Sequence, residues 1–160
     1  DDLITILPDS IRSVLRTNMR GIPQDSTILN AAVANYLNKF YARRQPISGD
    51  LDSANAQMGF NVYQYMWGDH EFLATGILKD FDRTSSLSQI HVPTLYTVGE
   101  FDESRPSTVK YYQSMTPNSM LRIIEDAGHM TMHDNPADNL RAVSEFLNEV
   151  DHHQQGLSKD

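Results

Sequence analysis

The sequence contains no cysteine, and this absence excludes several kinds of chemistry at once. A chain without thiols forms no disulfide, offers no thiolate to a metal ion and has no thiol nucleophile. The absence does not decide the cellular compartment, because cytosolic proteins and some secreted ones lack cysteine. Any nucleophile that works with this chain must therefore come from another residue type.

Long apolar runs and a surplus of positive charge are also missing. No run approaches the ~20 apolar residues that a membrane-spanning helix needs, and the opening "DDLITILPDS" has two acids where a secretory signal carries basic residues. The formal net charge of −8 repels phosphate backbones and anionic lipid surfaces. We therefore expect no nucleic-acid partner, no membrane partner and, by default for a signal-free chain, a cytoplasmic location.

The composition itself is that of a folded globular chain. Hydrophobic residues make up 39% and charged residues 21% of the 160 residues, with 8 Gly and 7 Pro. These values suit one hydrophobic core and leave little room for two independent ones. The start on two aspartates without a methionine suggests a processed or truncated end.

The first half of the chain has the apolar spacing of helices. Spacings of three and four over residues 3–20 predict two short helices, interrupted near Pro8. A clearer helix begins near Ser26, with Asp25 or Ser26 as its N-cap, and ends before Pro46.

Residues 51–68 predict one weaker helix that Gly68 closes, and residues 69–90 predict loop and short helix.

The second half alternates between strand and helix patterns. The run "TLYTV" after Pro93 and the run "MLRII" at 120–124 predict buried strands, and helices begin at Pro106 and Pro136. The residues expected to face inward on these helices are Val109, Tyr112, Met115, Leu140, Val143, Phe146, Leu147 and Val150. This alternation predicts an α/β fold with parallel strands and with chemistry at their carboxyl ends.

Two candidate catalytic residues follow these two strands. Asp102 lies in the acidic stretch "VGEFDESRP" (98–106), and His129 lies in "EDAGHMTMHD" (125–134). Side by side, they would be the orienting acid and the general base of a nucleophilic triad. The alternative is an aspartate that caps a turn and a histidine that is hydrogen-bonded in a loop. No G-x-S-x-G occurs, and in the order serine, acid, histidine the serine would lie upstream of residue 1.

Two further constellations have competing interpretations. Glu71 and Glu103 would form a site for a cation if they converged, whereas the alternative is solvated surface charge. His129 and His133 stand four residues apart, as in some zinc sites, but no Glu follows His129 and the surrounding residues indicate a loop. We therefore predict no metal.

Several motifs together resemble one family. The segments "YMWGDHEFLATGILKDFDR", "VPTLYTVG", "GEFDE" and "AGHMTMHD" occur in an order and spacing similar to the C-terminal half of the proline iminopeptidases, an α/β-hydrolase family. The likeness runs from about residue 58 to 150, and the preceding helices resemble the family's cap. It implies a helical cap at 1–85, the last strands and helices of the hydrolase core at 86–150, and a polar tail at 151–160.

The resemblance also implies roles for individual residues. Asp102 would be the triad acid and His129 the base, while Glu71 and Glu103 would bind the free α-amino group of the substrate. Tyr63 and Trp67 would help to line the pocket for the first residue. The expected activity is release of an N-terminal residue, preferably proline, through an acyl-enzyme and without a cofactor.

The departure from the family is the missing first half of the sheet, with its serine and oxyanion-hole glycines. We expect a second chain or segment to supply the serine. Two alternatives stay open: a related hydrolase of amino-acid amides or esters, and a non-catalytic fragment.

Overall fold

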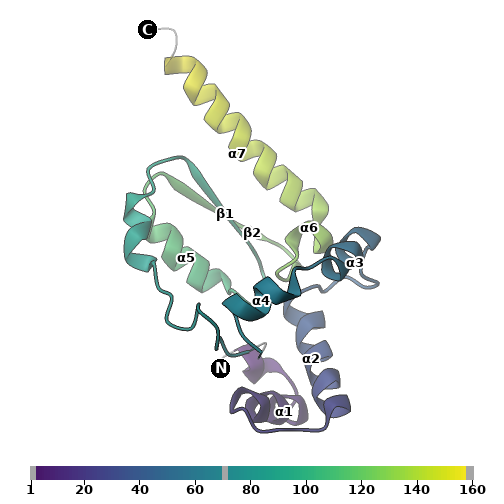
Figure 1. Ribbon diagram of the computed structural model, residues 1–160. Coiled ribbons are helices and arrows are strands. Elements are labelled where there is room, and N and C mark those ends of the chain that lie inside the picture. The colour runs from purple at the N-terminus through teal and green to yellow at the C-terminus, as the bar shows by residue number, and fades with distance from the viewer. Residues whose placement is uncertain (1–2, 70–71, 158–160) are drawn as a thin grey trace. The chain divides into compact units, whose positions relative to one another are not determined.

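Residues 3–69 and 72–157 are described by the computed structural model, and they fall into two units (Figure 1). One unit comprises Asp1–Asn38 and Pro46–Asp82, and the other comprises Lys39–Gln45 and Arg83–Asp160. None of the helices in the described ranges is long and apolar enough to cross a membrane.

The first unit is helical. Its elements are η1 (Leu3–Ile6), α1 (Asp9–Met19), α2 (Ser26–Phe40), α3 (Gly49–Ala56) and α4 (Phe60–Met66), with the last two residues of α2 belonging to the other unit. The predicted interruption near Pro8 is confirmed, since Pro8 is the N-cap of α1. Asp25 caps α2, because its Oδ1 accepts the backbone N–H groups of Thr27 and Ile28 at 2.8 and 3.2 Å.

The single helix predicted over 51–68 is wrong, because the structure has two short helices there. α3 ends at Ala56 and α4 begins at Phe60, with Gly59 as its N-cap. α3 has no buried residue, so burial of an apolar face does not extend this helix past Ala56. Gly68 follows α4 with φ +111°, and a Cβ there would collide with Thr75, so a glycine is required.

The second unit has the predicted order of strand, helix, strand, helix. Strands β1 (Thr94–Gly99) and β2 (Ser119–Ile124) pair in parallel, from Thr94 opposite Ser119 to Gly99 opposite Ile124. The helical elements are η2 (Thr84–Gln89), α5 (Pro106–Met115), α6 (Thr131–Asp134) and α7 (Pro136–Leu157). Figure 1 shows α5 and α7 on opposite sides of the two strands.

The inward faces predicted for α5 and α7 are partly wrong. Val109 is buried, but Tyr112 is 37% exposed. On α7 Ala142 is buried, whereas Leu140 and Leu147 are 66% and 54% exposed. A two-stranded sheet is too narrow to cover a helix of 22 residues, so much of the apolar surface of α7 faces outward. The helix also continues to Leu157, into the segment predicted as a polar tail.

Candidate active site

The loops after β1 and β2 are joined by backbone hydrogen bonds that continue beyond the strands. The N–H of Glu100 donates to Ile124 O, and the N–H of Phe101 donates to Ala127 O, both at 2.9 Å. Gly99 allows this approach, because a Cβ there would collide with the carbonyl oxygens of Ala127 and Gly128. The loop carrying Asp102 and the loop carrying His129 are therefore held side by side.

Asp102 and His129 form a hydrogen-bonded pair at the ends of the strands. The Nδ1–H of His129 donates to Oδ1 of Asp102 at 3.0 Å. Asp102 also accepts the backbone N–H of Ser104 at 2.8 Å and that of Gly99 at 3.4 Å. The side chain of Asp102 is 5% exposed and that of His129 is 42% exposed. The acid is thus enclosed, while the imidazole is accessible.

The pair shifts the titration of both members. Burial raises the pKa of Asp102, but the hydrogen bonds from His129 and Ser104 and the charge of His129 outweigh burial and hold that pKa below its usual value of 3.8. The hydrogen bond to Asp102 raises the pKa of His129 above its usual 6.5; burial opposes this, and the charges of Asp102 and Glu103 add to it. Because Nδ1 keeps its proton for Asp102, Nε2 is the nitrogen that exchanges a proton with another molecule.

The segment 39–45 supports the histidine loop from the other side. The N–H of His129 donates to Phe40 O and that of Met130 to Tyr41 O, both at 2.8 Å. The ring of Tyr41 stacks on that of His129, with centroids 6.1 Å apart and planes at 25°. The sequence offered no signal for this contact, because the two segments lie almost ninety residues apart.

Comparisons with known proteins find chains similar to this one. No protein-family model matches the chain. A proline iminopeptidase of Thermoplasma volcanium is 31% identical over 150 residues, which are 91% of this chain and 50% of the relative. One from Heyndrickxia coagulans is 42% identical over 90 residues, 56% of this chain and 31% of the relative. The crystal structure of proline iminopeptidase from Mycobacterium smegmatis matches with a TM-score of 0.83 and 28% identity, covering 99% of this chain and 52% of the other.

The chain is similar to the proline iminopeptidases. Two curated relatives match over most of this chain, and the chain spans about half the length of each of them. The crystal structure of VinJ also matches, with a TM-score of 0.82 over 93% of this chain and 51% of the other, and at 24% identity this likeness shows the fold alone. The predicted fold class is confirmed: an α/β chain that corresponds to the C-terminal part of an α/β-hydrolase with a helical cap.

The remaining residues predicted for a proline iminopeptidase site are distributed over both units. Glu103 is half-buried in the α/β unit, and its charge acts on His129. Tyr63 and Trp67 are half-buried in the helical unit, one helical turn apart, with the N–H of Trp67 donating to Tyr63 O at 2.7 Å. Glu71 lies outside the described residues. The structure therefore brings Asp102, His129 and Glu103 into one unit, and the roles of all six residues stay predictions.

No metal cluster is found among the residues that the structure describes. The Nε2–H of His133 donates to the backbone oxygen of Arg44 at 2.9 Å, so this histidine is not turned toward His129 as a co-ligand.

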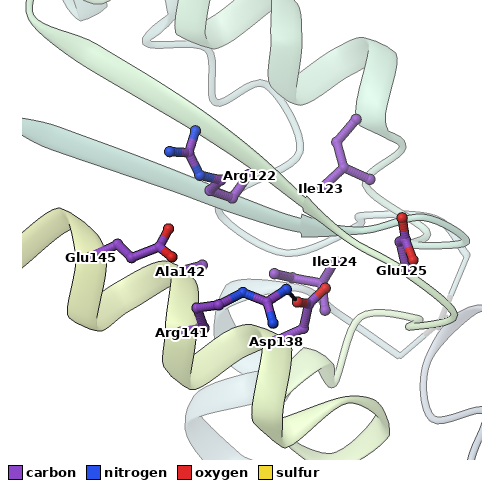
Figure 2. A pocket seen from close by; sticks show the side chains of 8 residues that line it. All are labelled: Arg122, Ile123, Ile124, Glu125, Asp138, Arg141, Ala142 and Glu145. Atoms are coloured by element: carbon purple, nitrogen blue, oxygen red, sulfur yellow. Dashed lines mark ion pairs between the residues drawn. The ribbon is translucent and has the colours of Figure 1, made fainter.

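A separate groove of about 270 Å³ lies between β2 and α7 (Figure 2). It contains the ion pair of Arg141 and Asp138, and none of the predicted site residues lines it.

Proposed function

We propose that this chain is the C-terminal part of a serine aminopeptidase that releases an N-terminal residue, preferably proline, from peptides through an acyl-enzyme. The observation that carries the proposal is the 3.0 Å hydrogen bond between His129 and Asp102 at the ends of two parallel strands. The similarity to proline iminopeptidases over 91% of the chain supports the same assignment.

His129 would act as the general base and then as the general acid. Its Nε2 takes the proton of a serine hydroxyl as the serine oxygen attacks the scissile carbonyl, and it then gives this proton to the leaving amine. Water repeats the sequence on the acyl-enzyme and frees the released residue. Asp102, which is nearly enclosed, holds Nδ1–H and stabilises the imidazolium that forms.

Glu71 and Glu103 would select substrates with a free N-terminus. Two carboxylates facing one ammonium favour an N-terminal residue, because an internal peptide bond would leave both acids buried and unpaired. Tyr63 and Trp67 would contribute apolar surface for the first residue. We propose no cofactor, since a serine, a base and an acid suffice for this reaction.

The serine would come from a segment or chain that corresponds to the other half of the family's proteins. Two observations support this: no G-x-S-x-G occurs in the sequence, and the chain spans about half the length of its relatives. Exposed apolar residues on α7 are the kind of surface that a neighbouring layer of a hydrolase core would cover. The cytoplasmic location remains a prediction.

The test is hydrolysis of a prolyl arylamide by the native preparation, combined with intact mass spectrometry under denaturing conditions. We expect prolyl arylamide to be hydrolysed, a polypeptide with G-x-S-x-G to be present, and His129→Ala to abolish hydrolysis. The matched control is His91→Ala, because His91 is exposed and precedes β1, at the opposite end of the strand from Asp102.

Retained activity in His129→Ala, or hydrolysis by a preparation that contains no such serine, would refute the proposal. A chain that occurs alone and is inert would identify a non-catalytic fragment.

A further inference from the structure

We propose that Asp134 is a positioning residue for His129, because its carboxylate fastens the histidine loop to the segment 39–45. The inference rests on the proposed role of His129 as the general base. Asp134 lies at the end of the short helix α6, five residues after His129. It does not contact the imidazole, so its action would be through the backbone.

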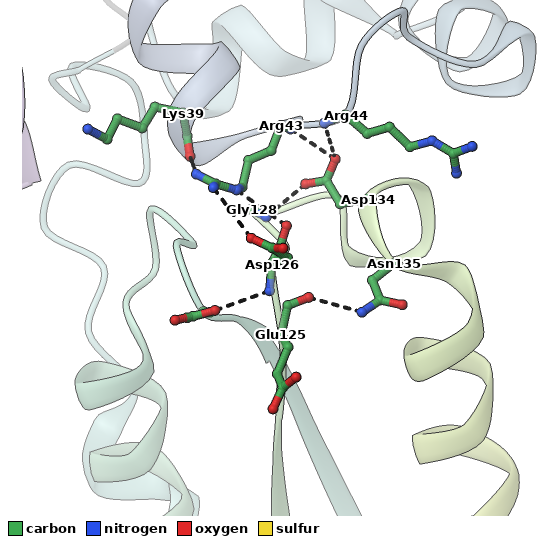
Figure 3. Close-up of polar contacts among 9 residues, drawn as sticks. Lys39, Arg43, Arg44, Glu125, Asp126, Gly128, Asp134 and Asn135 are labelled. Atoms are coloured by element: carbon green, nitrogen blue, oxygen red, sulfur yellow. Dashed lines mark hydrogen bonds and ion pairs between the residues drawn. The ribbon is translucent and has the colours of Figure 1, made fainter.

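The carboxylate of Asp134 accepts three backbone N–H groups from two distant parts of the chain (Figure 3). Oδ1 accepts from Arg43 and Arg44, each at 2.9 Å, and Oδ2 accepts from Gly128 at 2.7 Å. Hydrogen bonds to a charged acceptor are about twice as strong as neutral ones. Gly128 is buried, so removal of the carboxylate would deprive an enclosed N–H of its acceptor.

The position of Gly128 makes this contact directly relevant to the base. Gly128 immediately precedes His129, whose own N–H donates to Phe40 O. A Cβ on Gly128 would lie 2.7 Å from that same oxygen, so the two backbones touch. A shift of Gly128 away from the segment 39–45 would therefore move His129 with it.

The upstream end of the loop is fixed in a comparable way. Asp126 has a left-handed backbone conformation, with φ +56°. Its N–H donates to Oε2 of Glu100 at 3.1 Å, and its carbonyl accepts Nε–H of Arg43 at 3.3 Å. Residues 127–133 thus run between two anchored positions, of which Asp134 is the downstream one.

The carboxylate of Asp134 accepts its hydrogen bonds from backbone N–H groups and not from the imidazole of His129. A loss of Asp134 should therefore change the geometry of the bond from His129 to Asp102. A variant that removes another carboxylate from the same loop controls for the loss of one negative charge.

The experiment is an NMR titration of the His129 ring in this chain, comparing Asp134→Asn with Asp126→Asn. Both variants remove one carboxylate from the same loop. The amide in Asp134→Asn keeps an oxygen for Arg43 and Arg44 but turns an NH₂ group toward the N–H of Gly128. Asp126→Asn removes only an exposed ion pair with Arg43 at 3.7 Å, which contributes little, and asparagine tolerates the positive φ, so the loop should keep its conformation.

We expect Asp134→Asn to lower the titration midpoint of His129 toward that of Asp102→Asn, in which the charged partner is absent. Asp126→Asn should titrate like the unmodified chain. Asp134→Ala offers no acceptor, so its His129 midpoint should lie still closer to that of Asp102→Asn. If Asp134→Ala does not fold, the comparison of Asp134→Asn with Asp126→Asn is the test.

Equal midpoints in folded Asp134→Asn, Asp126→Asn and the unmodified chain would overturn the proposal. The titration needs no hydrolysis, so an inert preparation in which Asp134→Asn still displaces the midpoint would count against the proposed function and not against the positioning role.

Discussion

At the scale of single residues, the acidic stretch after β1 divides its charges among different partners. Glu100 accepts the N–H of Asp126, whereas Asp102 accepts from His129. Glu103 is half-buried, and its charge acts on the imidazole. Neighbours along the chain therefore have different partners, and Asp102 is the one that accepts the hydrogen bond of the His129 imidazole. The strand-end position of Asp102 and His129 was predictable from the sequence, but the role of Glu100 in holding the next loop was not.

The coupled titration of Asp102 and His129 predicts how stability depends on pH. The raised pKa of His129 contributes stability that is full below its ordinary value of 6.5 and is lost as the pH rises through the folded-state pKa. The lowered pKa of Asp102 contributes stability above 3.8 that is lost as the pH falls through its folded-state pKa. We therefore expect the unmodified chain to be thermally more stable than His129→Gln between pH 3.8 and pH 6.5. This difference should become smaller as the pH rises above 6.5.

The measurement is the unfolding midpoint of both chains from pH 4 to pH 9 by circular dichroism. The difference should be modest, because the His129 side chain is 42% exposed and solvent screens the pair. His91→Gln is the control, and its difference from the unmodified chain should not follow the titration of His129. A difference for His129→Gln that is constant with pH would contradict the coupling.

At the scale of elements, Gly99 determines how closely the loops that carry Asp102 and His129 approach each other. We expect Gly99→Ala to destabilise the chain by about 2–4 kcal/mol, because its Cβ would collide with two backbone carbonyls that cannot rotate away. The bond from Phe101 N–H to Ala127 O would be strained as the loops separate. Urea denaturation measures the change in the free energy of unfolding.

Gly49→Ala is the matched control for Gly99→Ala. Gly49 is the first residue of α3, and a Cβ there meets nothing within 4 Å. The same substitution should therefore be neutral or slightly stabilising at this position. Equal stability of the two variants would show that the loops after β1 and β2 can move apart freely.

How much of each element could be predicted depends on whether its signal is local. The strands and the helices from Pro106 and Pro136 follow from apolar runs and proline positions within ten or twenty residues. The helix α6 is only four residues long, and the sequence around it indicated a loop. The contact between Asp134 and Arg43 joins positions 91 residues apart, and no spacing rule along one chain detects such a pair.

At the scale of the whole molecule, the apolar residues that the sequence assigned to a core are in part exposed on α7. Leu140, Val143 and Leu147 are exposed at helical spacing, and exposed apolar side chains gathered on one helix are typical of an interaction site. We expect the 160-residue chain to bind the dye ANS, and the double variant Leu140→Gln with Leu147→Gln to bind much less of it. These residues are 66% and 54% exposed, so the double variant should change the free energy of unfolding by only about 0.5 kcal/mol.

Ile28→Gln with Phe60→Gln provides the comparison for this prediction. Ile28 and Phe60 are equally exposed, at 56% and 61%, but they lie on α2 and α4 of the helical unit. If this pair lowers dye binding as much as the α7 pair does, ANS binds to exposed apolar residues throughout the chain. The result would then give no evidence that a partner covers α7. If only the α7 pair lowers ANS binding, the apolar surface that another part of the hydrolase core would cover lies on α7, in the same unit as His129.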